Sequence, residues 1–111
     1  MSPTGGALHR PATRHLGLDL GVTNLKWSVV AHEDDSWTSV AGGQVPTNAA
    51  DGPASVVARM VEVTRDIQAA HPGITTLGVG VPGLFDPDSG VTEFLVNMPG
   101  GWRGVAVADP L

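Results

Sequence analysis

Residues 16–30, LGLDLGVTNLKWSVV, constrain the fold of this chain more than any other stretch. Leucine alternates with small or polar residues in the first half of the run, which is the period of a β-strand with one buried face. Residues 25–30 repeat the alternation, and the Gly-Val-Thr-Asn between them has hairpin length and turn-forming residues. The run therefore predicts two antiparallel strands joined by a tight turn, with Asp19 near the end of the first strand.

The sequence that follows predicts a third strand, a helix and a fourth strand. Residues 37–47 have strand character, and two glycines within them predict a β-bulge. Residues 50–73 have a helical apolar period, with Pro53 in the first turn and Asp51 as a candidate cap. Residues 74–82 are apolar with little alternation, which predicts a strand buried on both faces. The apolar face of the helix is predicted to consist of Val56, Val57, Met60, Val61, Thr64 and Ile67.

The order of these elements, β-β-β-α-β, predicts an α/β fold. Its first three strands form an antiparallel meander, and a right-handed crossover through the helix places the fourth strand parallel to the first. Beyond it, residues 83–90 are rich in turn formers, residues 91–96 predict a short strand, and residues 97–104 predict a loop. Residues 105–111 are expected to begin another element.

Composition excludes several classes of function. The net charge is −5 and no basic patch is visible, so we expect no nucleic-acid partner. The chain has no cysteine, which rules out a disulfide or a thiolate zinc site within it, and no apolar run long enough to cross a membrane. Residues 1–15 are polar, lack the apolar core of a secretory signal and are predicted to be a flexible leader to a single domain of residues 16–111. We therefore expect a cytoplasmic protein.

The turn between the first two strands is a candidate phosphate site. Gly21 allows a tight turn and close approach of a ligand, and turn amides can bind phosphate oxygens. Thr23 and Asn24 add hydrogen-bonding side chains, and Asp19 offers a carboxylate to Mg²⁺. The alternative is an ordinary hairpin in which Asp19 and Asn24 only form the turn. A second motif, Gly-x-Gly-x-x-Gly at 78–83, argues little for a dinucleotide site, since turn residues rather than a helix follow it.

Two motifs resemble a known family. The run 16–30 resembles the first phosphate loop of the actin-like ATPase superfamily, which includes sugar kinases, Hsp70 chaperones and actins. Residues 77–104 resemble the ROK family (repressor, open reading frame, kinase) through Gly-x-Gly-x-Pro-Gly-x-x-Asp followed by Asn-x-Pro-Gly-Trp. The chain is thereby identified as a member of that family: an N-terminal fragment of a glucokinase-like ROK sugar kinase. The implied fold is the ribonuclease H-like, actin-like ATPase N-terminal lobe, partial over residues 16–111 and incomplete at the C-terminus.

The resemblance implies an enzyme that phosphorylates a hexose with ATP and Mg²⁺. It implies that Asp86 supports its loop. The turn residues around Asp88 favour a surface turn there, and Trp102 is expected to pack rather than to stack on sugar. Val22 replaces a glycine of the family pattern, and a positive φ at this β-branched residue would be unfavourable. The implied ATP-phosphate ligands are Asp19, Gly21, Val22, Thr23 and Asn24, with Asp19 also the metal ligand; the implied sugar contacts are Gly83 and Asn97.

Other parts that the resemblance implies are expected beyond residue 111. They are the Asn-Asp pair whose aspartate takes the proton from the sugar, the second phosphate loop, the adenosine pocket and the cysteine-rich zinc site. We therefore expect this chain alone to be inactive and to bind ATP weakly, and the full-length relative to be a homodimer. Two alternatives stay open: a ROK-type sugar-responsive repressor without its DNA-binding part, and a non-catalytic sugar-binding remnant. The sequence does not distinguish among hexoses, or between ATP and polyphosphate as donor.

Overall fold

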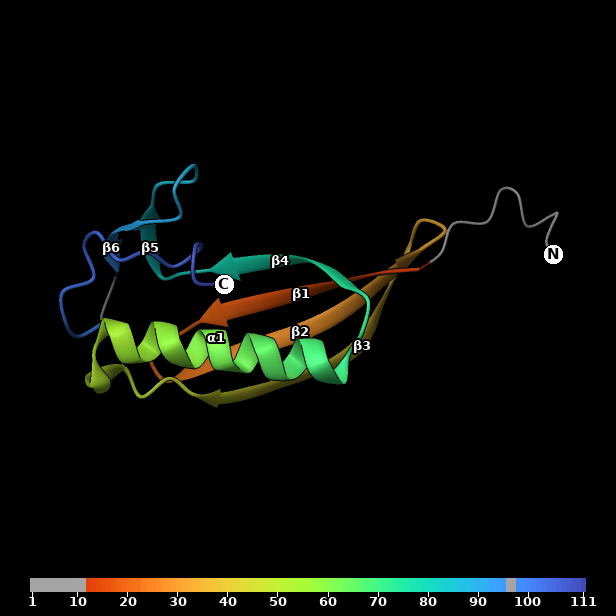
Figure 1. Ribbon diagram of the computed structural model, residues 1–111, viewed down its shortest axis with the longest axis horizontal. Coiled ribbons are helices and arrows are strands. Elements are labelled where there is room, and N and C mark those ends of the chain that lie inside the picture. The colour runs from red at the N-terminus through yellow and green to blue at the C-terminus, as the bar shows by residue number, and fades with distance from the viewer. Residues whose placement is uncertain (1–11, 96–97) are drawn as a thin grey trace, which may run out of the picture.

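The computed structural model describes residues 12–95 and 98–111. It shows a long four-stranded sheet with a helix lying along one face and a small two-stranded hairpin at one end (Figure 1). The elements are β1 (Thr13–Leu20), β2 (Asn24–Glu33), β3 (Ser36–Pro46), the 3-10 helix η2 (Ala49–Asp51), α1 (Pro53–Ala70), β4 (Ile74–Gly80), β5 (Gly83–Phe85) and β6 (Thr92–Leu95).

The topology of the large sheet confirms the predicted β-β-β-α-β core. The strand order is β3-β2-β1-β4; β1, β2 and β3 form an antiparallel meander, and β4 lies parallel to β1. β1 begins at Thr13, three residues before the predicted start at Leu16. The reason is that β2 extends beyond residue 30, so that Thr13 can pair with His32. Residues 13–15 therefore belong to the sheet and not to the leader, and residues 1–11 lie outside the described part of the chain.

The bulge in β3 lies two residues before the predicted glycines. Val29 pairs with Ala41 and Val30 with Ser39, which leaves Val40 as the extra residue. Gly43 instead has a packing role, since a Cβ atom there would lie 2.9 Å from the indole ring of Trp27. The glycine thus makes room for an aromatic side chain on the neighbouring strand.

The start of α1 corrects the capping prediction. Pro53 occupies the first turn as expected, but the N-cap is Gly52, with φ of 92° and no side-chain cap. Asp51 lies in η2 and pairs with Arg59, its Oδ2 lying 3.2 Å from Nη2. The left-handed conformation of Gly52 turns the chain between the two helices, so the carboxylate of Asp51 serves an ion pair instead of the helix terminus.

One hydrophobic core lies between the sheet and α1. Alternate residues of β1 and β2 face the helix, as the two-residue period predicts. Val61 was wrongly placed on the buried face of α1; it is half-buried, whereas Val63 packs against the core. The buried members contributed by these three elements are Leu16, Leu18, Leu20, Leu25, Val29, Val56, Val57, Met60, Thr64 and Ile67.

The prediction that the fourth strand is buried on both faces was wrong. β4 is an edge strand, and β1 is its one neighbour in the described part of the chain. Leu77 and Val79 are half-buried against the core, while Thr76, Gly78 and Gly80, which alternate with them, are exposed. The strand looked apolar throughout because its exposed face carries glycines where polar residues would usually stand.

The end of the chain folds onto the hairpin of β5 and β6. The predicted strand within 91–96 is confirmed as β6, and it pairs antiparallel with β5. Residues 105–111, expected to begin a new element, instead form a single bridge from Ala106 to Val91 and a turn. Trp102 is 4% exposed and its Nε1 donates to the carbonyl of Pro99 at 3.1 Å, which confirms that it packs.

Within residues 12–95 and 98–111, no helix has both the length and the apolar character that crossing a bilayer requires.

Candidate functional site

The turn between β1 and β2 is closed by its own backbone. The Gly21 N–H donates to the Asn24 carbonyl at 3.0 Å, with Val22 and Thr23 as the two residues between them. A Cβ atom on Gly21 would lie 2.8 Å from the same carbonyl oxygen, so the turn requires glycine at this position. Val22 does not have a positive φ, and its β-branched side chain therefore fits the turn without the strain that the sequence suggested.

Only part of the turn is free to bind an anion. The amide of Gly21 donates within the turn and is therefore not available to a phosphate oxygen. The amides of Val22 and Thr23 have no hydrogen-bond partner among the described residues, and both residues are exposed. Two adjacent free N–H groups and the Thr23 hydroxyl form a small set of donors suited to phosphate oxygens.

Asp19 lies on the sheet face opposite α1. It alternates with buried leucines on either side, so its side chain is exposed on the open face. Lys26 is its direct cross-strand partner on β2, and both line a shallow cavity of about 240 Å³ with Gly17 and Ser28. Leu18 and Trp27 complete the lining of this cavity.

The structure brings the two sequence motifs together. Asp19 is the register partner of Gly80 on β4, and a Cβ atom on Gly80 would lie 3.6 Å from Oδ1 of Asp19. Because β1 and β4 are parallel, the segments that leave their carboxyl ends lie at the same edge of the sheet, which is where ligands bind in open α/β sheets. Gly83 follows three residues later, exposed, at the start of β5. Asn97 lies outside the described residues.

The Gly-x-Gly-x-x-Gly motif is not a dinucleotide loop. Gly78 and Gly80 lie inside β4, and the third glycine begins β5 instead of a helix. No helix N-terminus is therefore available there for a pyrophosphate.

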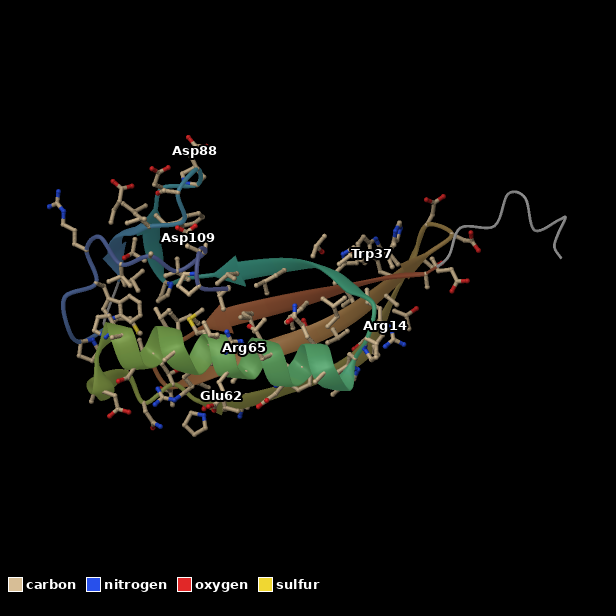
Figure 2. The ribbon with its side chains drawn as sticks, viewed as in Figure 1. Arg14, Trp37, Glu62, Arg65, Asp88 and Asp109 are labelled. Atoms are coloured by element: carbon tan, nitrogen blue, oxygen red, sulfur yellow. The ribbon has the colours of Figure 1, made fainter. Side chains whose placement is uncertain are left out.

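The acidic residues of the hairpin serve its turn. Oδ1 of Asp86 accepts a hydrogen bond from the Asp88 amide at 3.0 Å, and the Asp86 carbonyl accepts from Gly90 at 2.7 Å. Figure 2 shows Asp88 at the outer tip of the hairpin, and Asp109 in the C-terminal segment at the same end of the molecule. Asp86 thus supports its loop, and Asp88 is a surface turn residue, both as expected.

The Asp19 carboxylate is the candidate magnesium ligand of this site. No group of three or more His, Cys, Asp or Glu residues that could hold a metal occurs in the part of the chain that the structure describes. A lone exposed carboxylate such as Asp19 suits Mg²⁺ that keeps most of its water and is shared with substrate phosphates. The site therefore fits a magnesium-nucleotide complex better than a resident metal ion.

Sequence reasoning missed three polar residues around the turn. Lys26 lies opposite Asp19, Thr47 contacts the turn, and Arg59 contacts Thr47. Alternation along the second strand could have placed Lys26 on the same face as Asp19. No local pattern signals Thr47, because it follows β3 and reaches the turn only through the pairing of three strands.

Comparison with known proteins supports this architecture. No protein-family model matches the chain, and neither does any curated protein. Among solved structures, the ROK hexokinase from Thermus thermophilus is similar to it with a TM-score of 0.67 and 25% sequence identity over 88% of this chain. A candidate sugar kinase from Cytophaga hutchinsonii ATCC 33406 is similar in fold, with a TM-score of 0.62 and 24% identity over 87% of this chain.

The matches cover only part of those proteins. The chain spans 30% of the length of each of these two structures. The antiparallel meander, the crossover helix and the parallel fourth strand are the elements expected of an actin-like ATPase N-terminal lobe. This chain is therefore an α/β domain with the fold of that lobe, and it matches in structure the N-terminal region of a ROK hexokinase.

Proposed function

We propose that this chain is the phosphate-binding part of an ATP-dependent hexose kinase of the ROK type. The turn of Gly21–Asn24 binds the phosphates of ATP, and Asp19 binds the accompanying Mg²⁺ through water or directly. Gly83 contacts the sugar through its backbone, and Asn97 hydrogen-bonds a sugar hydroxyl. The full-length protein is a cytoplasmic homodimer that phosphorylates a glucose-like sugar.

The observation that carries the proposal is the pairing of Asp19 with Gly80. It joins the segment that resembles a phosphate loop to the segment that resembles a sugar loop. A kinase needs this juxtaposition, because phosphoryl transfer depends mainly on holding donor and acceptor in line. An ordinary hairpin that merely used Asp19 as a turn former would not require a second glycine-rich segment beside it.

Each residue has a distinct task in this proposal. Bound magnesium-ATP supplies the phosphoryl group and the charge that offsets its oxygens. The free amides of Val22 and Thr23 donate to phosphate oxygens, and the Lys26 ammonium adds positive charge on the face that Asp19 occupies. Glycine at position 80 keeps the space beside the Asp19 carboxylate open.

The chain alone is expected to be inactive. The resemblance assigns proton removal from the sugar to an aspartate in an Asn-Asp pair, and residues 1–111 contain no such pair. The remaining groups hold phosphate but leave the sugar hydroxyl without its base, which typically costs a factor of about 10²–10⁴ in rate.

Amide NMR of the isotope-labelled chain tests the phosphate assignment. Millimolar magnesium-ATP is expected to shift the resonances of Val22 and Thr23, and the shifts should weaken when Asp19→Asn removes the carboxylate. Asp88→Asn is the matched control, because Asp88 lies at the outer tip of the hairpin and should not alter the titration. No shift in the turn, or an equal response in all three proteins, would refute the phosphate site.

A second experiment tests the kinase assignment. Sequencing the locus beyond the codon for Leu111 should reveal a frame that continues into an Asn-Asp pair and a cysteine-rich motif. A stop codon directly after Leu111 would instead favour the non-catalytic sugar-binding remnant. In that case a glucose titration should shift Gly83 while ATP shifts nothing.

A further inference from the structure

Thr47 is buried beneath the turn that joins β1 and β2. Its side chain is 1% exposed, and it directly follows β3 in the chain. The Thr47 hydroxyl donates to the Gly21 carbonyl at 2.7 Å, and the Thr47 amide donates to the Thr23 carbonyl at 2.9 Å. One residue therefore holds two carbonyl groups of the same four-residue turn.

These two hydrogen bonds determine which groups the turn can offer to a ligand. A carbonyl oxygen that faced a phosphate would repel it, because both carry negative charge. With the carbonyls of Gly21 and Thr23 bound to Thr47, the groups of the turn left without a partner in the described structure include the amides of Val22 and Thr23. The turn is thereby left with donors toward an anion.

Thr47 is itself fixed to the helix. Nη1 of Arg59, in α1, donates to the Thr47 carbonyl at 2.5 Å, and Nη2 of the same guanidinium pairs with Asp51 at 3.2 Å. A planar guanidinium with two partners is held in a defined orientation. The turn, the end of β3 and the start of α1 are thus connected through three side chains.

We infer that Thr47 is a positioning residue for the phosphate turn and that Arg59 sets its position from α1. The inference deepens the proposed function, since it names what orients the turn when phosphate binds. Thr47 touches no substrate in this assignment. It acts by keeping the carbonyls of Gly21 and Thr23 away from the phosphate oxygens.

Hydrogen exchange of the Gly21 amide tests the inference on the chain itself. Thr47→Val keeps the shape and removes the hydroxyl, so the Gly21 amide should exchange faster by about tenfold or more. Thr47→Ser restores the hydroxyl and should return the rate toward that of the unsubstituted chain. Thr64→Val is the matched control, because Thr64 is also buried and its hydroxyl also donates to a backbone carbonyl, that of Met60 within α1.

A second variant covers the case in which Thr47→Val does not fold. Arg59→Met leaves the turn intact and frees the Thr47 carbonyl, and Gly21 exchange should rise by at least about threefold. A Gly21 rate within about twofold of the unsubstituted protein in folded Thr47→Val or Arg59→Met would overturn the inference. So would an equal rise in Thr64→Val, which would show a general loss of stability.

A titration with magnesium tripolyphosphate separates this inference from the proposed function. The unsubstituted chain and Thr47→Ser should show shifts of Val22 and Thr23, and Thr47→Val should show weaker ones. If the unsubstituted chain shows no shift, the phosphate site is refuted, whereas the positioning of the turn by Thr47 is decided by the exchange rates alone.

Discussion

Asp19 and Gly80 are register partners on adjacent parallel strands, and the absence of a side chain on Gly80 leaves the Asp19 carboxylate open on that side. The same region contains a second glycine, Gly21, whose surroundings are much tighter. A Cβ atom added to Gly80 would lie 3.6 Å from Oδ1 of Asp19. A Cβ atom added to Gly21 would lie only 2.8 Å from the backbone oxygen of Asn24. The two glycines therefore differ in what a methyl group would do.

Gly21→Ala should destabilise the chain by about 1–3 kcal/mol, because the backbone of Asn24 must move to admit the methyl group. Gly80→Ala should change the free energy of unfolding by less than about 1 kcal/mol, since its contact distance is an ordinary one. Urea unfolding followed by circular dichroism measures both. Equal losses in the two variants would contradict the tight closure of the turn.

Gly43→Ala should displace the indole ring of Trp27. The new methyl group would lie 2.9 Å from ring atoms, and a cost of about 1–3 kcal/mol in the free energy of unfolding is expected. Gly42→Ala is the matched control, because its methyl group would meet only the Trp27 carbonyl at 3.4 Å. Near-ultraviolet circular dichroism should change in the first variant only; the opposite order would contradict the register of β3.

Asp35→Gly should stabilise the chain. Asp34 and Asp35 both have positive φ, 48° and 65°, in the turn between β2 and β3, as a type I′ hairpin turn requires. Glycine at the second position removes the cost of the left-handed conformation and should raise the free energy of unfolding by up to about 1 kcal/mol. Thermal unfolding measures this gain in stability. Asp88→Gly is the control, because Asp88 is a turn residue without positive φ and should gain no stability.

Met60→Ala should cost about 2–5 kcal/mol, because the side chain is fully buried between α1 and the sheet. Val61→Ala, one position along, should cost less than about 1 kcal/mol, since Val61 is only half-buried. Chemical denaturation of the two variants distinguishes the faces of the helix. A larger loss for Val61→Ala would instead place Val61 on the buried face, as the sequence predicted.

Local periodicity predicted the elements but not all of their limits. The meander, the helix and the parallel fourth strand could be predicted because alternation and the helical period are written in contiguous residues. The start of β1 at Thr13 could not, because residues 13–15 are polar and join the sheet only through pairing with the extended β2. The exposure of β4 depends on its position at the sheet edge, which apolar composition does not encode.

The candidate site shows the same division. Gly21 and Asp19 are visible in sequence because turn chemistry is local, and the structure places both where the hairpin predicts. Thr47 and Arg59 are separated by 12 residues from one another, and Thr47 by 26 from the carbonyl that it binds. Their roles come from tertiary pairing. Asp51 was assigned to a cap because sequence could not show the left-handed Gly52 between it and the helix.

The bulge at Val40 affects how the outer strand meets other molecules. β3 contains no charged residue from Ser36 to Pro46, so nothing in its composition repels an approaching strand. The extra residue divides it into segments of different pairing phase, Ser36–Ser39 and Ala41–Pro46. A straight foreign strand could match the hydrogen-bonding groups of only one segment at a time. The bulge thus protects this edge strand against fibril-like strand addition, a protection that charged residues usually provide.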